Sequence, residues 1–279
     1  MSLRQLEYLL AVVEEGSFTL AARRLDVSQP ALSHQVRALE RSVGQPLLER
    51  AAPGVHLTPM GRAFVPHAES ALRRAERARL SLRPEVTELR IATLYSIAIG
   101  ILPAAIRAWR SRHPGGRVEV LEYANIEALA EQMRRGVADV AIGPRPAHWD
   151  DDVRVLGEED LVVVLAEWPG ERIALAELAD RPWVLYAHDN SLTPVVERAC
   201  AAAGFSPRAA VRTHHTATAV RLAAAGLGPA LAPASMIAEA AGGAVAWPDP
   251  PVRRELCAFG PAAMTAALVD ELERRVRGA

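Results

Sequence analysis

The 279-residue sequence contains no lysine, so that all 32 of its basic residues are arginine. This absence excludes chemistry that needs a side-chain amine, such as a pyridoxal Schiff base or a P-loop lysine. Two cysteines are too few for a disulfide scaffold, and neither a signal peptide nor an apolar run of membrane-spanning length is present. We therefore expect a soluble, cytoplasmic protein, and the length suggests two domains.

Positive charge is concentrated in the N-terminal part. Residues 1–83 carry 12 Arg against eight Asp and Glu, a formal charge of +4, whereas the remainder carries 20 Arg against 25 acids, a formal −5. A basic module on an acidic body suggests that only the first part meets a polyanion.

The first sixty residues have the apolar spacing of three short helices. Helices are expected over 3–14 and 17–25, and a third begins after Ser28, a good N-cap. Asp26 and Val27 form the tight turn between the last two, which is the geometry of a helix-turn-helix. An ordinary three-helix bundle would give the same pattern. The polar residues expected on the outer face of the third helix are Gln29, Ser33, His34 and Arg37.

Residues 58–83 predict one long helix that begins with Thr58 as cap and Pro59 in its first turn. An apolar stripe with heptad spacing favours pairing with a second subunit, and its alanines permit close helix approach. The alternative is a helix that packs on its own chain. Pro66 should bend this helix or delay its start. The stripe consists of Phe64, Ala68, Ala71, Ala75, Ala78 and Leu82.

Strands and helices alternate after residue 86, which predicts an α/β body with a mostly parallel sheet. Strands are expected at 88–94, 117–123 and 139–143, and a second unit starts with the apolar strand 160–165. In such folds ligands bind at the carboxyl ends of the strands.

Four stretches of the N-terminal part, residues 16–25, 28–40, 43–50 and 55–61, resemble the LysR-type transcriptional regulators. The resemblance is dense over residues 1–65 and continues more loosely to the C-terminus. It implies an N-terminal winged helix-turn-helix, mainly α, whose wing is a hairpin around residues 51–56. A linker helix would follow, and then an α/β effector domain of two subdomains, similar to periplasmic binding proteins. The implied boundaries are 1–58 for the DNA-binding domain, 59–85 for the linker helix, 86–279 for the effector domain, about 86–158 and 260–279 for subdomain I, and about 159–259 for subdomain II.

The resemblance also implies binding residues. The residues that would face the DNA groove are Gln29, Pro30, Ser33 and His34, and Arg50 would contact a phosphate. Ser28 and Arg37 are further candidates for DNA binding. Candidate effector contacts lie at strand ends and helix starts, where free N–H groups attract anions. Ser96 matches the hydroxyl position of the family's pocket, although each candidate could equally be a helix cap or a solvated loop residue. The candidates are Tyr95, Ser96, Asn125, Pro144, Arg145, His188, His215, Thr216 and Thr218.

The function that this resemblance implies is a ligand-responsive, sequence-specific DNA-binding regulator of transcription. We expect a homotetramer, built as a dimer of dimers on an interrupted palindrome, and a small-molecule effector such as an organic acid. RNA polymerase would be a partner if the protein activates. No membrane partner, catalytic residue, metal or cofactor is expected. The alternatives are an α/β solute-binding protein or enzyme that uses the cleft between the subdomains, and a constitutive DNA binder without an effector.

Three further motifs are weaker. Gly226 and Gly228 hint at a dinucleotide fingerprint, but they follow a helix instead of opening one. His188, His214 and His215 could form a metal site, although no acidic or cysteine partner has ligand spacing. Cys200 and Cys257 could form a redox switch, but their apolar surroundings favour buried, inert thiols.

Overall fold

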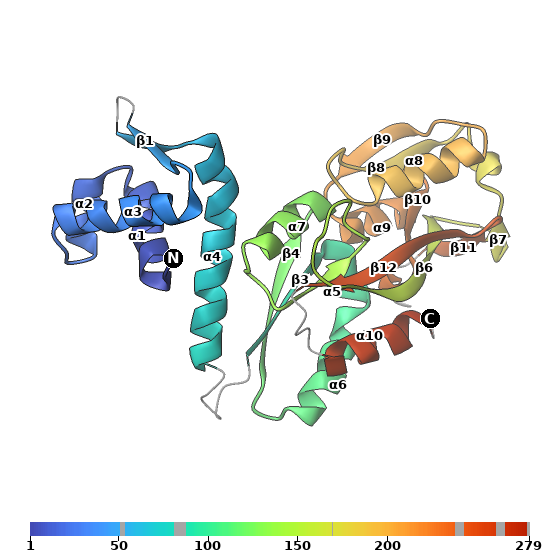
Figure 1. Ribbon diagram of the computed structural model, residues 1–279. Helices are drawn as coiled ribbons and strands as arrows, with labels where there is room; N and C mark the ends of the chain where they lie inside the picture. Colours follow the sequence, from blue (N-terminus) through green and yellow to red (C-terminus); the bar gives the residue numbers. More distant parts are fainter. Residues whose placement is uncertain (51–53, 81–87, 169, 238–242, 261–265, 278–279) are drawn as a thin grey trace. The chain divides into compact units, whose positions relative to one another are not determined.

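The computed structural model describes residues 1–50, 54–80, 88–168, 170–237, 243–260 and 266–277. The chain divides into two compact units, one formed by residues 1–86 with 134–137, the other by residues 87–133 with 138–279. Figure 1 shows a helical first unit and a second unit of helices on a sheet. Among the described residues no helix is long and apolar enough to cross a membrane.

The predicted helix-turn-helix is confirmed in the first unit. It consists of α1 (Leu3–Glu15), α2 (Phe18–Arg24) and α3 (Gln29–Val43). Each helix begins after a serine whose hydroxyl accepts a hydrogen bond from a backbone N–H in the first turn, as the sequence predicts for the last two. The turn between α2 and α3 contains Asp26, whose φ of 52° is left-handed. Leu9, Val12, Leu32 and Leu39 are completely or almost completely buried at the centre of the three helices.

A short antiparallel hairpin follows α3, as expected for a wing. Its strands β1 (Leu48–Arg50) and β2 (Val55–Leu57) pair Leu48 with Leu57, and residues 51–53 of the predicted wing lie outside the described residues. The carboxylate of Glu40 accepts hydrogen bonds from the backbone N–H groups of Leu47 and Leu48, at 2.9 and 3.1 Å. Because Glu40 belongs to α3, the wing is anchored directly to the recognition helix.

The predicted long helix is α4 (Pro59–Leu80), which begins at Pro59 and contains Pro66 in its interior. Its first half packs on the helical core of its own unit, where Ala68 is only 2% exposed and Phe64 and Ala71 are partly buried. This half of the stripe therefore packs within its own chain, and its pairing with a second subunit stays a prediction. Ala75 and Ala78 lie beyond that core, and Leu82 lies outside the described residues.

The second unit alternates strands and helices. Its first half contains β3 (Glu88–Leu94), α5 (Tyr95–Gly100), α6 (Leu102–Arg112), β4 (Arg117–Tyr123), α7 (Ile126–Arg134) and β5 (Val140–Gly143). The next elements are β6 (Val153–Leu165), β7 (Arg172–Ile173), the 3₁₀ helix η1 (Leu175–Leu178), β8 (Pro182–Tyr186), α8 (Thr193–Ala202) and β9 (Arg208–Thr213). The last are α9 (Thr216–Ala224), β10 (Ala230–Pro233), the 3₁₀ helix η2 (Ala234–Met236), β11 (Ala244–Pro248), β12 (Val252–Phe259) and α10 (Ala266–Arg277).

The main sheet is mixed, which corrects the expectation of a mostly parallel one. Its strand order is β4-β3-β5-β12-β6-β11-β7, and β10 also pairs with β6. The pairs β3–β4 and β3–β5 are parallel, but β12 is antiparallel to β5 and to β6. The sequence pattern marks only the last six residues of β6 as a strand and gives no bounds for β12, so the antiparallel pairing was not predicted.

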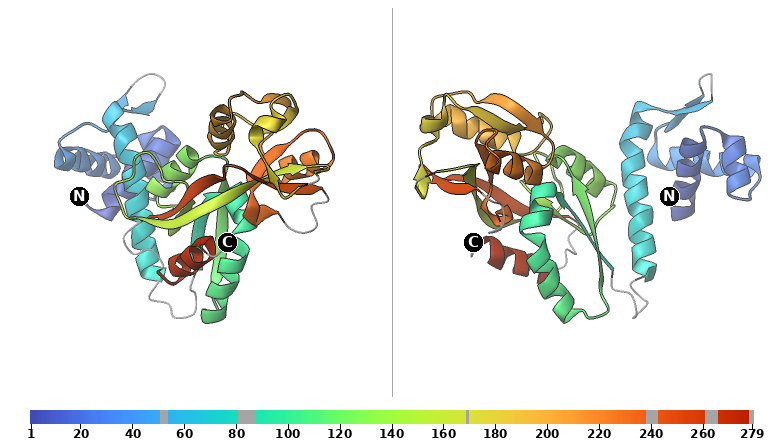
Figure 2. Two further views of the ribbon diagram at one scale, coloured as in Figure 1. Left: turned by 90° about the vertical axis from the view of Figure 1, so that its right-hand side faces the viewer. Right: turned by 180° about the vertical axis from the view of Figure 1, so that it is seen from behind.

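Two hydrophobic cores divide this unit. We call the part around Ile91, Trp109 and Phe259 subdomain I, and the part around Trp183 and Tyr186 subdomain II. The strands β6 and β12 run side by side through both parts (Figures 1 and 2). Helix α10 packs on α6 in subdomain I, which agrees with the assignment of residues 260–279 to this subdomain.

Candidate DNA-binding and effector sites

The first turns of α3 present the polar face that the sequence predicts. Pro30, His34 and Arg37 are exposed and Gln29 is half-buried. The hydroxyl of Ser28 is already used, because it caps α3 by accepting from the N–H of Ala31 at 3.4 Å. The side chain of Arg50 lies outside the described residues.

Ser33 corrects the prediction that it lies on the outer face, because only 7% of it is exposed. The buried stripe of α3 contains Leu32, Val36 and Leu39. At about 100° per residue, Ser33 lies roughly 60° around the helix from Val36, at the edge of that stripe. Its small side chain fits between α3 and the neighbouring core instead of reaching outward.

Several candidate effector residues meet where subdomain I faces subdomain II. The ring of Tyr95, at the start of α5, contacts the ring of His215 edge-on, with centroids 4.8 Å apart. Beside Asn125, the carbonyl of Ala124 accepts a hydrogen bond from the N–H of Ser191 at 3.4 Å. Tyr95 and His215, both predicted from strand ends and helix starts, therefore lie together although they belong to different subdomains.

The other candidates have different surroundings. The side chain of Asn125 caps α7 by accepting a hydrogen bond from the N–H of Ala128 at 2.8 Å. Asn125 therefore has the role of a helix cap, the alternative to an effector contact. Arg145 is exposed and lies 3.5 Å from Glu255. His188 and Thr218 are exposed, and Pro144 is half-buried.

A buried polar cluster at the same junction was not predicted from the sequence. Arg254 of β12 donates from Nε to Glu159 of β6 at 2.7 Å, and from Nη2 to the hydroxyl of Ser96 at 2.9 Å. The hydroxyl of Ser235 in η2 donates to the other oxygen of Glu159. Arg254 and Glu159 are only 5% and 6% exposed. The cluster joins α5 of subdomain I to η2 of subdomain II through the two crossing strands.

Close backbone packing supports this junction. A Cβ at Gly100, the last residue of α5, would lie 2.2 Å from the hydroxyl oxygen of Ser235. Only glycine therefore lets α5 approach η2 this closely.

Tyr186 and Thr216 lie next to the cluster. The Tyr186 hydroxyl donates to the carbonyl of Leu231 at 2.9 Å and is also hydrogen-bonded to Thr216, the buried first residue of α9. Burial raises the pKa of Tyr186, whereas the positive charge of Arg254 lowers it in part. The phenol therefore stays neutral at physiological pH.

Burial also raises the pKa of the two thiols. Cys200 and Cys257 are buried free cysteines, and burial is the main cause that raises the pKa of each to about 12. In the folded state such thiols ionise only when the pH rises well above the pKa that a cysteine has in the unfolded chain.

We expect iodoacetamide at pH 8 to alkylate the folded protein far more slowly than the urea-denatured chain. A pKa raised from 9.0 to about 12 lowers the thiolate fraction about 1,000-fold. Mass spectrometry of the two time courses checks this, and peroxide should leave DNA binding unchanged. Rapid labelling of the native protein at either residue would restore the redox alternative.

The glycine and histidine motifs have structural explanations. Gly228 has a φ of 137°, and a Cβ there would lie 2.1 Å from the carbonyl oxygen of Pro182, so close packing of backbone requires glycine. His214 lies 3.6 Å from Asp189. Within the described ranges, no group of three or more His, Cys, Asp or Glu residues could hold a metal ion.

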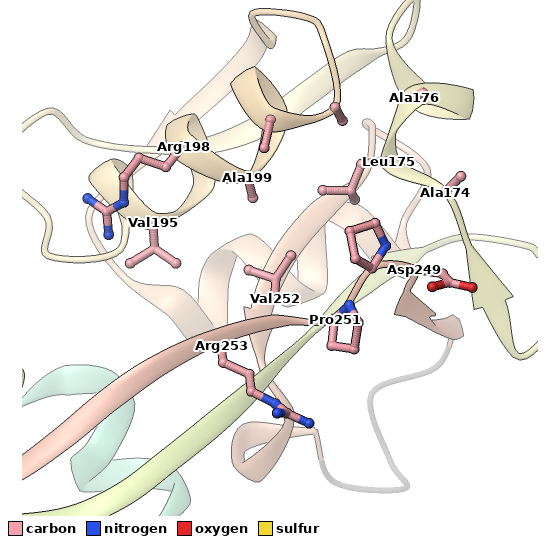
Figure 3. A pocket seen from close by; sticks show the side chains of 13 residues that line it. Ala174, Leu175, Ala176, Val195, Arg198, Ala199, Asp249, Pro251, Val252 and Arg253 are labelled. Carbon is pink, nitrogen blue, oxygen red and sulfur yellow. The ribbon is translucent and has the colours of Figure 1, made fainter.

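A separate pocket of about 490 Å³ lies in subdomain II between α8, η1 and the start of β12 (Figure 3). Its lining is mainly apolar, including Leu175, Val195 and Val252, with Arg198 and Arg253 also contributing. None of the candidate effector residues lines it. The guanidinium of Arg253 is engaged with Asp160 at 2.7 Å.

A winged helix-turn-helix joined to a two-part α/β body with polar groups between its subdomains defines the class of ligand-responsive DNA-binding regulators. The model of the LysR substrate binding domain matches residues 83–277, and that of the bacterial regulatory helix-turn-helix protein, lysR family, matches residues 3–62. The chain belongs to the LysR family of DNA-binding transcriptional regulators.

Curated relatives of this chain are also named as transcriptional regulators. The HTH-type transcriptional regulator TfdT of Cupriavidus pinatubonensis is 34% identical over 200 residues, which cover 67% of this chain and 85% of TfdT. The Hca operon transcriptional activator HcaR of Escherichia coli is 34% identical over 246 residues, covering 85% of this chain and 83% of HcaR. Both are named as regulators and not as enzymes.

Solved structures of full-length regulators have the same fold. CbnR, a LysR family transcriptional regulator, superposes with a TM-score of 0.64 at 28% identity, covering 99% of each chain. Full-length CbnR in complex with its target DNA gives a TM-score of 0.56 at 28% identity, covering 100% of this chain and 99% of CbnR.

Proposed function

We propose that this regulator reads its promoter through the exposed face of α3 and responds to a small organic acid bound at the junction of the two subdomains. Gln29, Pro30, His34 and Arg37 contact the DNA groove, and Arg50 contacts a phosphate of the backbone. Tyr95, Ser96, His215 and Thr216 surround the effector. The protein acts as a dimer of dimers on an interrupted palindrome, and it has no catalytic activity.

The observation that carries the DNA-binding part is the anchored recognition helix. On its first turns Pro30, His34 and Arg37 are exposed, and Glu40 fixes the wing to the same helix. A rigid pair of groove-reading helix and backbone-contacting wing gives sequence discrimination, since base contacts require a fixed register. The structure of CbnR with its target DNA supports the same mode of binding.

The proposal of an effector site rests on the polar side chains that lie together at the junction of the two subdomains. Tyr95 and His215 contact each other from opposite subdomains, and Ser96 and Thr216 are the adjacent buried hydroxyl-bearing residues. A ligand that binds between two subdomains shifts their arrangement only through its different affinity for the two states.

The test is fluorescence anisotropy with the duplex immediately upstream of the protein's own coding sequence, run across a salt series beside an unrelated duplex. We expect the upstream duplex to bind at least 100-fold more tightly, within the range typical of specific regulators. Equal, weak binding to both duplexes would count against the proposal.

Replacing Gln29 with alanine should weaken binding to the specific duplex about 10-fold, because one base-edge contact is worth about 1–3 kcal/mol. Binding to the unrelated duplex and the salt slope should stay unchanged, since no phosphate contact is removed. Gln132→Ala, in α7, is the matched control. A parallel loss on both duplexes would show that Gln29 does not read sequence.

A further inference from the structure

Arg254 has hydrogen-bonding capacity that the described residues do not use. A guanidinium carries five N–H donors. Nε and Nη2 contact Glu159 at 2.7 and 2.6 Å, and Nη2 also donates to Ser96 at 2.9 Å. Nη1 is buried and has no hydrogen-bond partner among the described residues. Because an unpaired donor on a buried charge is strongly unfavourable, Nη1 indicates a partner other than the described residues.

Ser96 adds a second donor at the same place. Its oxygen accepts from Arg254, which leaves its own proton available for another acceptor. Ser96 is itself buried, and it lies at the start of α5, next to the Tyr95 ring. Two donors, one charged and one neutral, are therefore directed from adjacent side chains.

The local charge selects the kind of partner. The carboxylate of Glu159 balances Arg254, so the pair is neutral before a ligand arrives. The start of α9 lies beside Tyr95, because the ring of His215, the residue that precedes α9, contacts the Tyr95 ring, and it adds the partial positive charge of a helix N-terminus near Ser96. This environment tolerates one negative charge much better than two, which favours a carboxylate over a phosphate dianion.

We propose that Arg254 is the anchor of the effector's carboxylate: Nη1 donates to one oxygen and the Ser96 hydroxyl to the same group. This assignment rests on the proposed function of the junction and deepens it. Glu159 is a positioning residue, since it holds the guanidinium by Nε and Nη2 and leaves the Nη1 side for the ligand.

The position of this anchor explains how the ligand would act on both subdomains. The cluster links Ser96 in α5 with Ser235 in η2 through Arg254 and Glu159. Because Nη1 is sealed from solvent, a carboxylate reaches it only when the elements around Arg254 rearrange. Binding and subdomain rearrangement are then the same event, which gives the ligand a differential affinity for two states.

The test uses formate, the smallest carboxylate, on the full-length protein. Thermal unfolding is followed in 100 mM formate, in chloride of equal ionic strength, in 100 mM formamide and in inorganic phosphate. We expect formate alone to raise the melting temperature of the second unit, by about 3 °C for an affinity near 10 mM. No formate-specific rise, or an equal rise in formamide, would overturn the anchor. A larger rise in phosphate would overturn the choice of a carboxylate.

Substitutions at Arg254 and Glu159 test whether the rise in melting temperature comes from formate bound at this cluster. The double substitution Arg254→Met and Glu159→Leu removes the anchor and its partner together and should abolish the formate response. The matched control replaces the neighbouring exposed pair on the same strands, Arg253→Met and Asp160→Leu, and should keep the response. A formate response that survives in the first variant contradicts the proposal.

Ser96→Ala provides a test that does not depend on the fold of the double variant. It keeps Arg254 and Glu159 and should weaken formate binding about 10-fold, since one hydrogen bond to a charged group is lost. Unchanged formate binding in this variant would contradict the assigned geometry. DNA binding without ligand is measured separately, so that failure of the regulator proposal is distinguished from failure of the anchor.

Discussion

Replacing Gly61 with alanine should reduce DNA binding about 100-fold or more and leave the second unit folded. A Cβ at this position would lie 2.1 Å from the carbonyl oxygen of Leu47 and 2.9 Å from the Leu57 side chain. Both neighbours belong to or border the wing, and a backbone oxygen has little room to move. Overpacking costs about 1–3 kcal/mol, and a backbone clash belongs at the upper end of that range.

The structural reason is that α4 and the wing meet at this glycine. The Thr58 hydroxyl accepts from the Gly61 N–H at 2.9 Å and donates to the carbonyl of Pro46 at 2.8 Å. Pushing Gly61 away breaks this connection, and the wing loses its fixed place beside α3. Because base readout needs a fixed register, specific binding should fail before nonspecific binding does.

Gly115→Ala is the matched control, because nothing lies within 4 Å of a Cβ there. DNA binding by anisotropy and two-transition calorimetry separate the effects on the two units. We expect the transition of the second unit to keep its temperature in both variants. Normal DNA affinity in Gly61→Ala would contradict the packing argument.

Replacing Glu159 alone with leucine should be the most destabilising change in the second unit. It leaves the charge of Arg254 buried without its partner, and breaking a buried ion pair in this way costs about 3–5 kcal/mol. For a unit of this size the melting temperature should fall by about 10 °C. Calorimetry at neutral pH measures it.

The comparison with the double variant makes the prediction specific. Arg254→Met together with Glu159→Leu should recover most of the loss, since a buried pair replaced by apolar groups of similar size is often nearly neutral. Asp160→Leu, on the next residue, should change stability little because its pair with Arg253 is partly exposed. If the single and double variants melted at the same temperature, the unpaired charge would not be the cause.

The DNA-binding part was the easier half to predict from the sequence. Its helices carry local signals, such as the capping serines and the apolar stripe through Leu32 and Leu39, which do not depend on distant residues. The prediction that Ser33 lies on the outer face of α3 was wrong, because the buried face of α3 is wider than its apolar residues alone indicate. The packing of Ala68 depends on α1, and a heptad pattern does not distinguish a core of the same chain from a partner.

The junction between the subdomains was only half predictable. Tyr95 and His215 follow from strand ends, a rule that needs no long-range register. Arg254 and Glu159 are almost 100 residues apart, and each stands in a run of charges that is typical of a solvated surface. Their pairing depends on the antiparallel register of β12 with β6, in which the two residues are direct partners. Strand register of this kind is set by the whole sheet, and a single segment does not reveal it.

The strand pair of β6 and β12, which runs through both subdomains, limits the ways in which they can move. Strands β6 and β12 are hydrogen-bonded along the whole of β12, so neither can slide past the other without breaking the ladder. Leu256 pairs with Gly157, whose φ is 147°, and the register shifts between Leu256 and Cys257. A bulge opposite such a glycine is the softest point of a ribbon. We therefore expect flexing between the two subdomains to centre on these residues.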